Sequence, residues 1–266
     1  MTRVGALVVV VAVIAAIFGP MLAPFDPSAQ ELALRLEGPS SLHWFGLDEL
    51  GRDIFARVLS GARISLMVGI VVVSVSATIG TMLGAIAGYF GGRVDEAISR
   101  IIDILLAFPG LLLAIALVAV LGPSLTNVVL ALCLIGWVGY ARLVRGQVLR
   151  AREFEFVQAA RALGAQTSRI LVQHIIPTAL PAVTVQATLG MGGAILAEAS
   201  LSFLGLGVQP PTPSWGTMLS YGRSHLLDAP HLTIFPGLAI AVVVLGFNFL
   251  GDGLRDTFDP ATTRRT

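Results

Sequence analysis

The sequence predicts an all-α membrane protein with six transmembrane helices. Of its 266 residues, 55% are hydrophobic and 12% are charged, about half the charged share of an ordinary soluble domain. The mean hydropathy is +0.85. Runs without charge recur along the chain at lengths that suit membrane crossing, and arginines gather in alternate connections between them.

The first two spans follow from two uncharged runs, Val4 to Phe25 and Ile64 to Gly92. A helix needs about 20 apolar residues to cross the hydrocarbon core, and both runs reach that length. A cleaved signal peptide is the alternative for the first run. Its 22 uncharged residues exceed the apolar core of about 7–15 residues that signal peptides use.

The third uncharged run, Ile104 to Ala141, would measure roughly 57 Å as one helix, which is too long for a single crossing. Its middle holds Gly122-Pro123-Ser124, a turn signal. We therefore expect a tight helical hairpin of two spans, Ile104–Leu121 and Leu125–Ala141.

The fifth span should begin near Pro181, because proline suits the first turn of a helix, and should end before Gly205. The sixth should cover about His231 to Gly251. Four connections then remain: an outer segment (26–62), a short inner loop (91–100), a long inner loop (142–180) and an outer loop (205–230).

The arginines orient these spans. With both termini inside, twelve arginines fall on the inner side and five on the outer side. The positive-inside rule therefore predicts that both termini are cytoplasmic.

Composition also excludes several functions. All 17 basic residues are arginine, so the chain has no lysine for a nucleotide-binding P-loop or a Schiff base. The single Cys133 excludes an intrachain disulfide and a thiolate metal cluster. The histidines lack the spacing of a zinc site, and no serine nucleophile motif occurs. We expect neither an enzyme nor a metal site.

Three glycines in the second span, Gly80, Gly84 and Gly88, are each four residues apart. Small residues at this spacing share one helix face and let another helix approach closely in lipid. We expect close packing there, within the chain or against a partner. General tolerance of glycine in membrane helices is the alternative.

Glu198 is the one acid inside a predicted span. A charge at the bilayer centre costs on the order of 2.5–3.5 kcal/mol, so this side chain should face protein or water. It is a candidate pathway residue. The alternative is a buried acid hydrogen-bonded to Ser200, to Ser202 or to another helix.

The long inner loop predicts two short cytoplasmic helices. Phe156, Ala159, Ala160 and Leu163 recur at helical spacing, which indicates an amphipathic helix. Gly164 is a natural stop for it. A second helix, capped by Thr167 or Ser168, should end before Pro177. Either the first helix presents a small-residue face to another protein or both helices lie in the membrane interface.

This loop resembles the EAA loop of ABC importer permeases. That pattern reads Glu-Ala-Ala, three residues, Gly, nine residues, then Ile-x-Leu-Pro. The matching positions, with full agreement in spacing, are Gln158-Ala159-Ala160, Gly164 and His174-Ile175-Ile176-Pro177. Gln158, His174 and Ile176 depart from the pattern in residue type.

Further motifs resemble the dipeptide, oligopeptide and nickel group of these permeases and together span nearly all of the chain after Leu42. They are Phe45-Gly46-x-Asp48-x-x-Gly51-Arg52-Asp53, Gly88-Tyr-Phe-Gly-Gly92, Asp103-x-x-x-Ala107-Phe108-Pro109, the stretch Ser202 to Gly216, and the ending Phe247 to Pro260.

The resemblance implies a type I ABC importer permease (MetI-like) fold in a bacterial inner membrane. It implies an N-terminal helix with an external segment (1–60), a permease core (61–255) and a short cytoplasmic tail (256–266). It also implies that Gln158, Ala159, Ala160, Gly164 and Pro177 belong to a loop that couples the permease to an ATPase.

The partners that the resemblance implies are two ABC ATPase subunits, a second and different permease subunit, an external solute-binding protein and membrane lipid, with no nucleic acid. The chain itself would hold no cofactor, because ATP binds to the ATPase subunits. The expected function is import of di- or oligopeptides by alternating access.

Alternative cargoes for the same machinery are nickel, glutathione and opines. A secondary transporter, which works without an ATPase, is a more distant alternative. Such proteins often show inverted repeats and ion sites near the membrane midplane, and the sequence shows neither an internal repeat nor a cluster of intramembrane acids.

Overall fold

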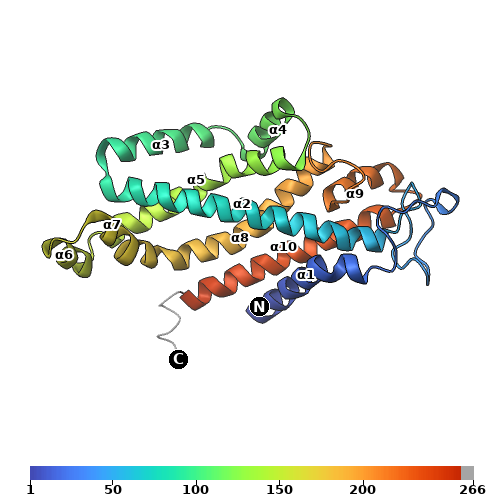
Figure 1. Cartoon of the computed structure of the whole chain (residues 1–266), viewed down its shortest axis with the longest axis horizontal. Coiled ribbons are helices and arrows are strands. Elements are labelled where there is room, and N and C mark those ends of the chain that lie inside the picture. The colour runs from blue at the N-terminus through green and yellow to red at the C-terminus, as the bar shows by residue number, and fades with distance from the viewer. Residues whose placement is uncertain (259–266) are drawn as a thin grey trace.

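A computed structural model describes residues 1–258, which form an elongated bundle of helices (Figure 1). Five helical stretches are long and apolar enough to cross a membrane, and a bent pair of shorter helices makes a sixth candidate. The five are α1 (Thr2–Leu22), α2 (Ile54–Phe90), α5 (Leu125–Ala151), the continuous stretch Thr167–Phe203 and α10 (His231–Phe258). Six spans, as predicted, result when the bent pair counts as one.

The third span differs from the prediction. Instead of one straight helix over Ile104–Leu121, the chain forms α3 (Gly92–Leu106) and α4 (Gly110–Leu121), bent by 83°. Pro109 explains the break, because it has no backbone N–H and disfavours helical conformation in the preceding residue. The predicted inner loop at 91–100 is therefore mostly the first part of α3.

The predicted turn before α5 is confirmed. Gly122 has a positive φ of 94°, and the hydroxyl of Ser124 caps α5 by accepting a hydrogen bond from the Asn127 N–H at 3.1 Å. The helix then continues to Ala151, past the predicted end at Ala141. The inner loop is correspondingly shorter than expected.

The prediction that a helix ends before Pro177 is wrong, and so is the start of the fifth span near Pro181. α7 (Thr167–Arg169) passes through a π-helical turn (Ile170–Ile175) into α8 (Ile176–Phe203). The Ile176 N–H bonds to the carbonyl of Leu171, five residues back. This wider turn accommodates Pro177, which has no N–H to donate.

Two other boundaries also shift. α2 begins at Ile54 rather than Ile64, and α1 ends at Leu22 rather than Phe25. The tail expected at 256–266 begins inside α10, and its residues 259–266 lie outside the described part of the chain.

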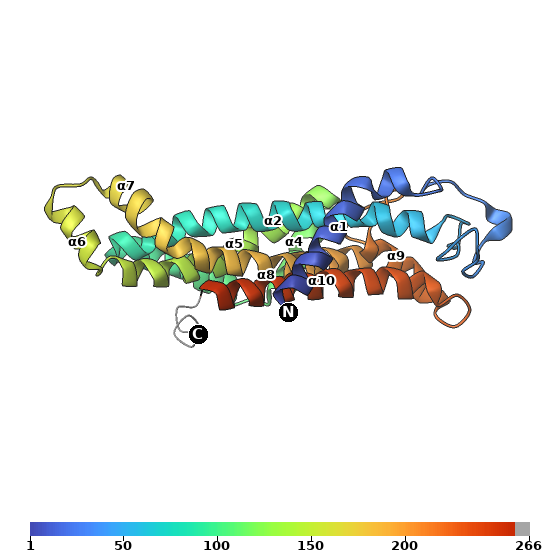
Figure 2. The same cartoon turned by 90° about the horizontal axis from the view of Figure 1, so that it is seen from below.

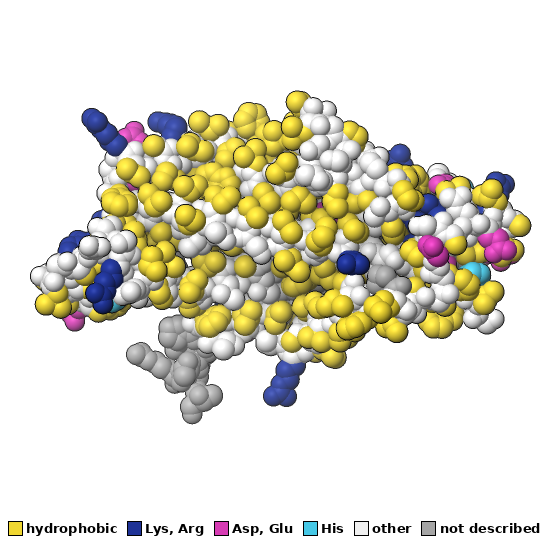
Figure 3. Space-filling view, in the orientation of Figure 1, with side chains coloured by type: hydrophobic (Ala, Val, Ile, Leu, Met, Phe, Trp, Pro, Cys, Tyr) yellow, Lys and Arg dark blue, Asp and Glu magenta, His cyan; other side chains and the backbone are white. Residues whose placement is uncertain are grey.

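The two ends of the bundle differ in character. α6 (Glu155–Ala162) and α7 project at one end, while the segment before α2 and the short α9 (Trp215–Gly222) cover the other (Figures 1 and 2). Hydrophobic side chains cover most of the long face in Figure 3, and charged side chains gather toward the ends. This distribution suits a protein that crosses a bilayer.

α9 lies inside the connection predicted at 205–230. A reciprocal pair of hydrogen bonds between Ser214 and Thr217 caps its start. The Trp215 indole N–H donates to the carbonyl of Val58 in α2 at 2.9 Å, and Gly61 makes this approach possible because a Cβ there would lie 3.0 Å from the indole ring.

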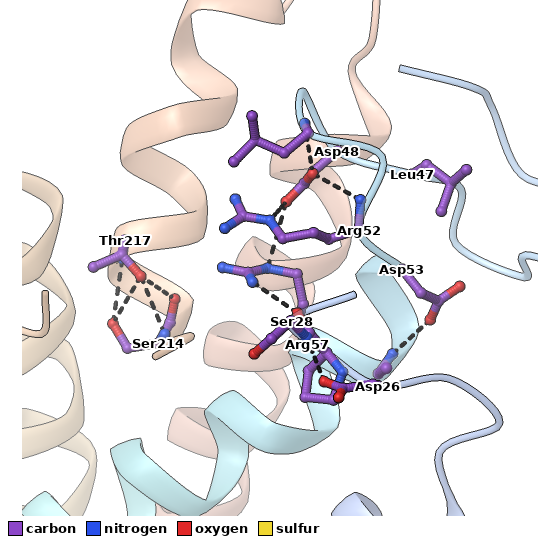
Figure 4. Close-up of polar contacts among 12 residues, drawn as sticks. Asp26, Ser28, Leu47, Asp48, Arg52, Asp53, Arg57, Ser214 and Thr217 are labelled. Atoms are coloured by element: carbon purple, nitrogen blue, oxygen red, sulfur yellow. Dashed lines mark hydrogen bonds and ion pairs between the residues drawn. The ribbon is translucent and has the colours of Figure 1, made fainter. Parts of the chain in front are cut away.

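A buried polar cluster holds the N-terminal end of α2 (Figure 4). Asp48 accepts from Arg52 at 2.7 Å and pairs with Arg57 at 3.5 Å, and Asp53 pairs with His43 at 2.9 Å. These five side chains are all buried. Because buried charges need such partners, the cluster fixes the outer segment against α2.

Candidate functional site

Helix α6 projects from one end of the bundle, opposite the segment that precedes α2 (Figure 2). Gly164 ends it with a positive φ of 79°. The Gly164 N–H bonds to the carbonyl of Arg161 and the Ala165 N–H to that of Ala160, both at 3.0 Å. This pair of bonds is the Schellman arrangement, for which glycine is the favoured residue.

One side of α6 is largely exposed. Val157 is fully buried and belongs to the same apolar cluster as Ile170 and Ile175. On the other side, Phe156 is 48% exposed and Leu163 is 88% exposed. α6 is thus attached to its own chain through one face and presents large apolar side chains on the other.

The residues that match the EAA pattern divide between these environments. Gln158 and Ala159 are exposed, and Ala160 is partly buried. The Gln158 amide donates to the carbonyl of Glu153 at 3.3 Å, so it does not reach beyond its own loop. Pro177 is exposed at the start of α8.

The base of α6 borders a polar cavity of about 550 Å³ that also touches the C-terminal ends of α2 and α5. The Arg161 guanidinium lies over the ring of Tyr89 at 5.7 Å, and Arg152 donates to the carbonyl of Gly88 at 3.4 Å. These two contacts connect α6 and its preceding turn to the last turn of α2.

A second link joins the first turn of α3 to the C-terminal part of α5. The Arg145 guanidinium makes two hydrogen bonds to the Asp95 carboxylate, at 2.5 and 2.6 Å. Paired bonds of this kind are among the strongest that side chains form. No sequence signal connects these two residues, which lie 50 positions apart.

The three glycines of α2 all face α5. A Cβ at Gly80 would lie 2.5 Å from the Trp137 carbonyl oxygen, and one at Gly88 would lie 2.9 Å from that of Arg145. A Cβ at Gly84 would collide with the Ala141 carbonyl oxygen. The two helices therefore pack with their backbones in near contact.

Glu198 lies in α8 with 0% of its surface exposed. Its carboxyl accepts from the hydroxyl of Ser202, one turn on, at 2.7 Å, and from Ser65 of α2 at 3.2 Å. Ser200 instead donates to the carbonyl of Leu196. Glu198 thus joins two helices through hydrogen bonds.

At the end of the bundle opposite α6, His225 donates to the Asp228 carboxylate at 3.1 Å, and this hydrogen bond lowers the pKa of Asp228. His225 also lies 3.7 Å from Glu49. Among the described residues, no group of three or more His, Cys, Asp or Glu side chains is arranged to hold a metal ion.

Comparison with known families identifies this helical arrangement. Residues 80–264 match the binding-protein-dependent transport system inner membrane component. The chain belongs to this family. As a permease of an ABC importer, it is a multi-pass protein of the inner membrane, and the family works with ATPase subunits. Residues 1–39 match the N-terminal transmembrane domain of oligopeptide transport permease C.

Individual relatives are similar over nearly the whole chain. The dipeptide transport system permease protein DppC of Alkalihalophilus pseudofirmus is 51% identical over 97% of this chain and 84% of its own length. The probable D,D-dipeptide permease DdpC of Escherichia coli is 46% identical over 98% of this chain and 87% of its own length. The glutathione permease GsiD of Escherichia coli is 49% identical over 98% and 86%.

Two solved structures share the fold of this permease. An amino acid ABC transporter with histidines aligns with a TM-score of 0.59 and 17% identity, covering 76% of this chain and 94% of the other. The MetNI methionine ABC transporter aligns with a TM-score of 0.55 and 21% identity, covering 76% and 96%. Both support the MetI-like fold expected from the sequence.

Proposed function

We propose that this permease imports di- or oligopeptides. The observation that carries the proposal is 51% identity with a dipeptide permease over 97% of the chain. The matches to two further permeases with peptide-like cargo support the same substrate class.

In the proposed assembly, two permease subunits of different sequence form the pathway, two ATPase subunits bind ATP, and an external binding protein delivers the peptide. Both termini lie in the cytoplasm. This orientation places α6 on the side of the ATPase, where its exposed Phe156 and Leu163 offer an apolar face to a cleft.

Coupling then follows from the contacts of α6. Closure of the ATPase pair displaces α6, and the buried Val157 transmits the displacement to Ile170 and Ile175, which precede α8. Arg161 passes it to Tyr89 at the end of α2. Because α2 and α5 pack backbone to backbone, we expect them to move as one body during alternating access.

Glutathione is the second candidate cargo, because GsiD is nearly as similar as the dipeptide permease. Purification of the cognate binding protein with its natural ligand distinguishes the two. A bound peptide supports the main proposal, whereas glutathione, nickel or an opine would replace it.

The coupling role of α6 is tested with Leu163→Asp and Gly164→Trp. Leu163 makes little contact with its own chain, so Leu163→Asp should insert into the membrane normally. This variant should nevertheless lose both copurification with the ATPase and peptide uptake. Leu227→Asp is a matched control, because this leucine is 99% exposed at the opposite end of the bundle. Retained ATPase binding together with undiminished uptake in both test variants would refute the role.

A further inference from the structure

An apolar groove of about 600 Å³ lies between α1, α2 and α10. The side chains that line it are all aliphatic or aromatic. The one N–H among them, that of the Trp215 indole, already donates to the carbonyl of Val58 at 2.9 Å. These side chains therefore offer nothing to a polar ligand.

The groove is open along its length and about one leaflet deep. Four of its lining residues are at least half exposed, namely Leu7, Val11, Leu238 and Val242. Along α10 it extends from Phe235 to Val243, which is about 12 Å at 1.5 Å per residue. Half of a hydrocarbon core is about 15 Å. The stacked rings of Phe45 and Phe235 lie at the end nearer the start of α10, with their centroids 3.9 Å apart.

The volume of the groove favours an acyl chain over a helix of another subunit. A helix about 10 Å across would take up about 900 Å³ over the same length, which is more than the groove holds. A methylene group occupies about as much space as a water molecule, about 30 Å³, so the groove has room for about 20 of them. One acyl chain of a phospholipid fits within that space.

A cation without a partner in the chain stands beside this groove. Arg63 follows Ala62 and lies one helical turn beyond Leu59, and both of these residues line the groove. Arg63 is exposed and makes no hydrogen bond or ion pair with residues 1–258. By contrast, Arg57 of the same helix is buried beside the carboxylate of Asp48. The charge of Arg63 is therefore available to a ligand.

The position of Arg63 suits a lipid phosphate. It is the last charged residue before the uncharged run that begins at Ile64, so it marks where α2 enters the apolar part of the membrane. Helical side chains lean toward the N-terminus of their helix, and long arginine side chains extend toward the membrane surface. The guanidinium is thus directed back toward the headgroups, whose phosphates accept paired hydrogen bonds from arginine.

We propose that this groove binds one phospholipid of the surrounding leaflet, with an acyl chain between α1, α2 and α10 and the phosphate on Arg63. α1 approaches α10 closely at Gly5, where a Cβ would lie 2.5 Å from the Leu250 nitrogen, and α2 at Gly19, where it would lie 3.0 Å from Leu59. Between these two contacts the lipid completes the packing of α1. The proposal does not depend on the identity of the cargo.

Two photoreactive lipids test the proposal in the complete transporter, reconstituted in nanodiscs of phosphatidylethanolamine. One is phosphatidylglycerol with a diazirine in an acyl chain, and the other is a diacylglycerol that has the same chains but no phosphate. After illumination, mass spectrometry measures the labelling of the groove-lining peptides of α1, α2 and α10. The ratio of labelling by the two lipids reports recognition of the phosphate.

In wild type, phosphatidylglycerol should label the groove more strongly than diacylglycerol. Arg63→Gln should lower this ratio by about fivefold, because it removes the charge that pairs with the phosphate, and Arg63→Lys should retain most of it. Arg35→Gln is the matched control. Arg35 is also exposed, in the segment before α2, but it does not border the groove, so this variant should keep the wild-type ratio.

Ala15→Phe tests the acyl-chain site. Ala15 lines the groove from α1, so a ring at this position should occupy the space and lower the labelling of α2 and α10 by both lipids. Ile14→Phe adds a ring at a neighbouring position that is 49% exposed and does not line the groove. Labelling in this control should remain at the wild-type level.

Each contrary outcome overturns a defined part of the proposal. Equal ratios in wild type and Arg63→Gln overturn the phosphate site. Undiminished labelling of α2 and α10 in Ala15→Phe overturns the acyl-chain site. A groove that is unlabelled in wild type overturns the whole proposal, because another subunit would then cover it. None of these results bears on peptide import, since the labelling uses no cargo.

Discussion

Single residues without side chains set the distance between the two central helices. Gly80, Gly84 and Gly88 bring α2 against the backbone of α5, and Gly61 does the same for Trp215. The four-residue spacing predicted a packing face from the sequence alone. It could not indicate which helix would use that face, because α5 carries no complementary motif.

Gly84→Ala should destabilise the permease by about 1–3 kcal/mol, because the added methyl would overlap the Ala141 carbonyl and force the helices apart. Gly139→Ala in α5 is the control, since open space surrounds that position. Thermal unfolding in nanodiscs measures both. Equal melting temperatures for the two variants would contradict the close packing.

Two substitutions of Glu198 distinguish a structural role of this side chain from a role in the transport pathway. Glu198→Leu leaves the Ser65 and Ser202 hydroxyls without their acceptor and should cost about 1–3 kcal/mol of stability. Glu198→Gln keeps an acceptor and should unfold near the wild-type temperature. If Glu198→Gln abolishes uptake while remaining stable, the carboxyl acts in the pathway rather than in packing.

At the level of helices, charged residues indicate where an apolar run begins and ends, but they do not indicate where the helix itself starts. Arg57 and Arg63 lie inside α2, so an uncharged run predicted its start ten residues too late. Pro109 and Pro177 have opposite effects. The first breaks the third span, whereas the second is absorbed by a π-helical turn that no local sequence pattern indicates.

The Asp95–Arg145 ion pair between α3 and α5 should give a measurable coupling free energy. In a double-mutant cycle, Asp95→Ala and Arg145→Ala should show an interaction of about 1 kcal/mol, because the paired bonds are partly exposed. Arg152→Ala and Glu153→Ala, an exposed neighbouring pair, should be nearly additive. Additivity at Asp95 and Arg145 would show that another contact holds α3.

For the whole molecule, the sequence predicted the number of spans, their order and the first short helix in the loop between the fourth and fifth spans. The groove between α1, α2 and α10 could not be predicted, because it forms through tertiary packing alone. The same limit applies to the contacts of Val157, which depend on how α7 folds back. Local patterns indicate elements, and only the assembled bundle brings their side chains together.

Orientation is testable in a background of Cys133→Ser, which removes the only cysteine. In the permease produced without its ATPase, which would cover position 163, Leu227→Cys and Leu163→Cys place one thiol at each end, at positions 99% and 88% exposed. A membrane-impermeant maleimide should label the first in intact spheroplasts and the second only in inside-out vesicles. The reverse pattern would place both termini outside.

The π-helical turn at Ile170–Ile175 gives the stretch Thr167–Phe203 an unusual tolerance to a change in length. Such a turn contains one residue more than an α-helix needs over the same rise. Deleting Val172, which is 63% exposed, should convert it to regular α-helix and keep the register of α8. Deleting Thr184 from the body of α8 should instead rotate everything beyond it by about 100°, so only the second deletion should abolish assembly.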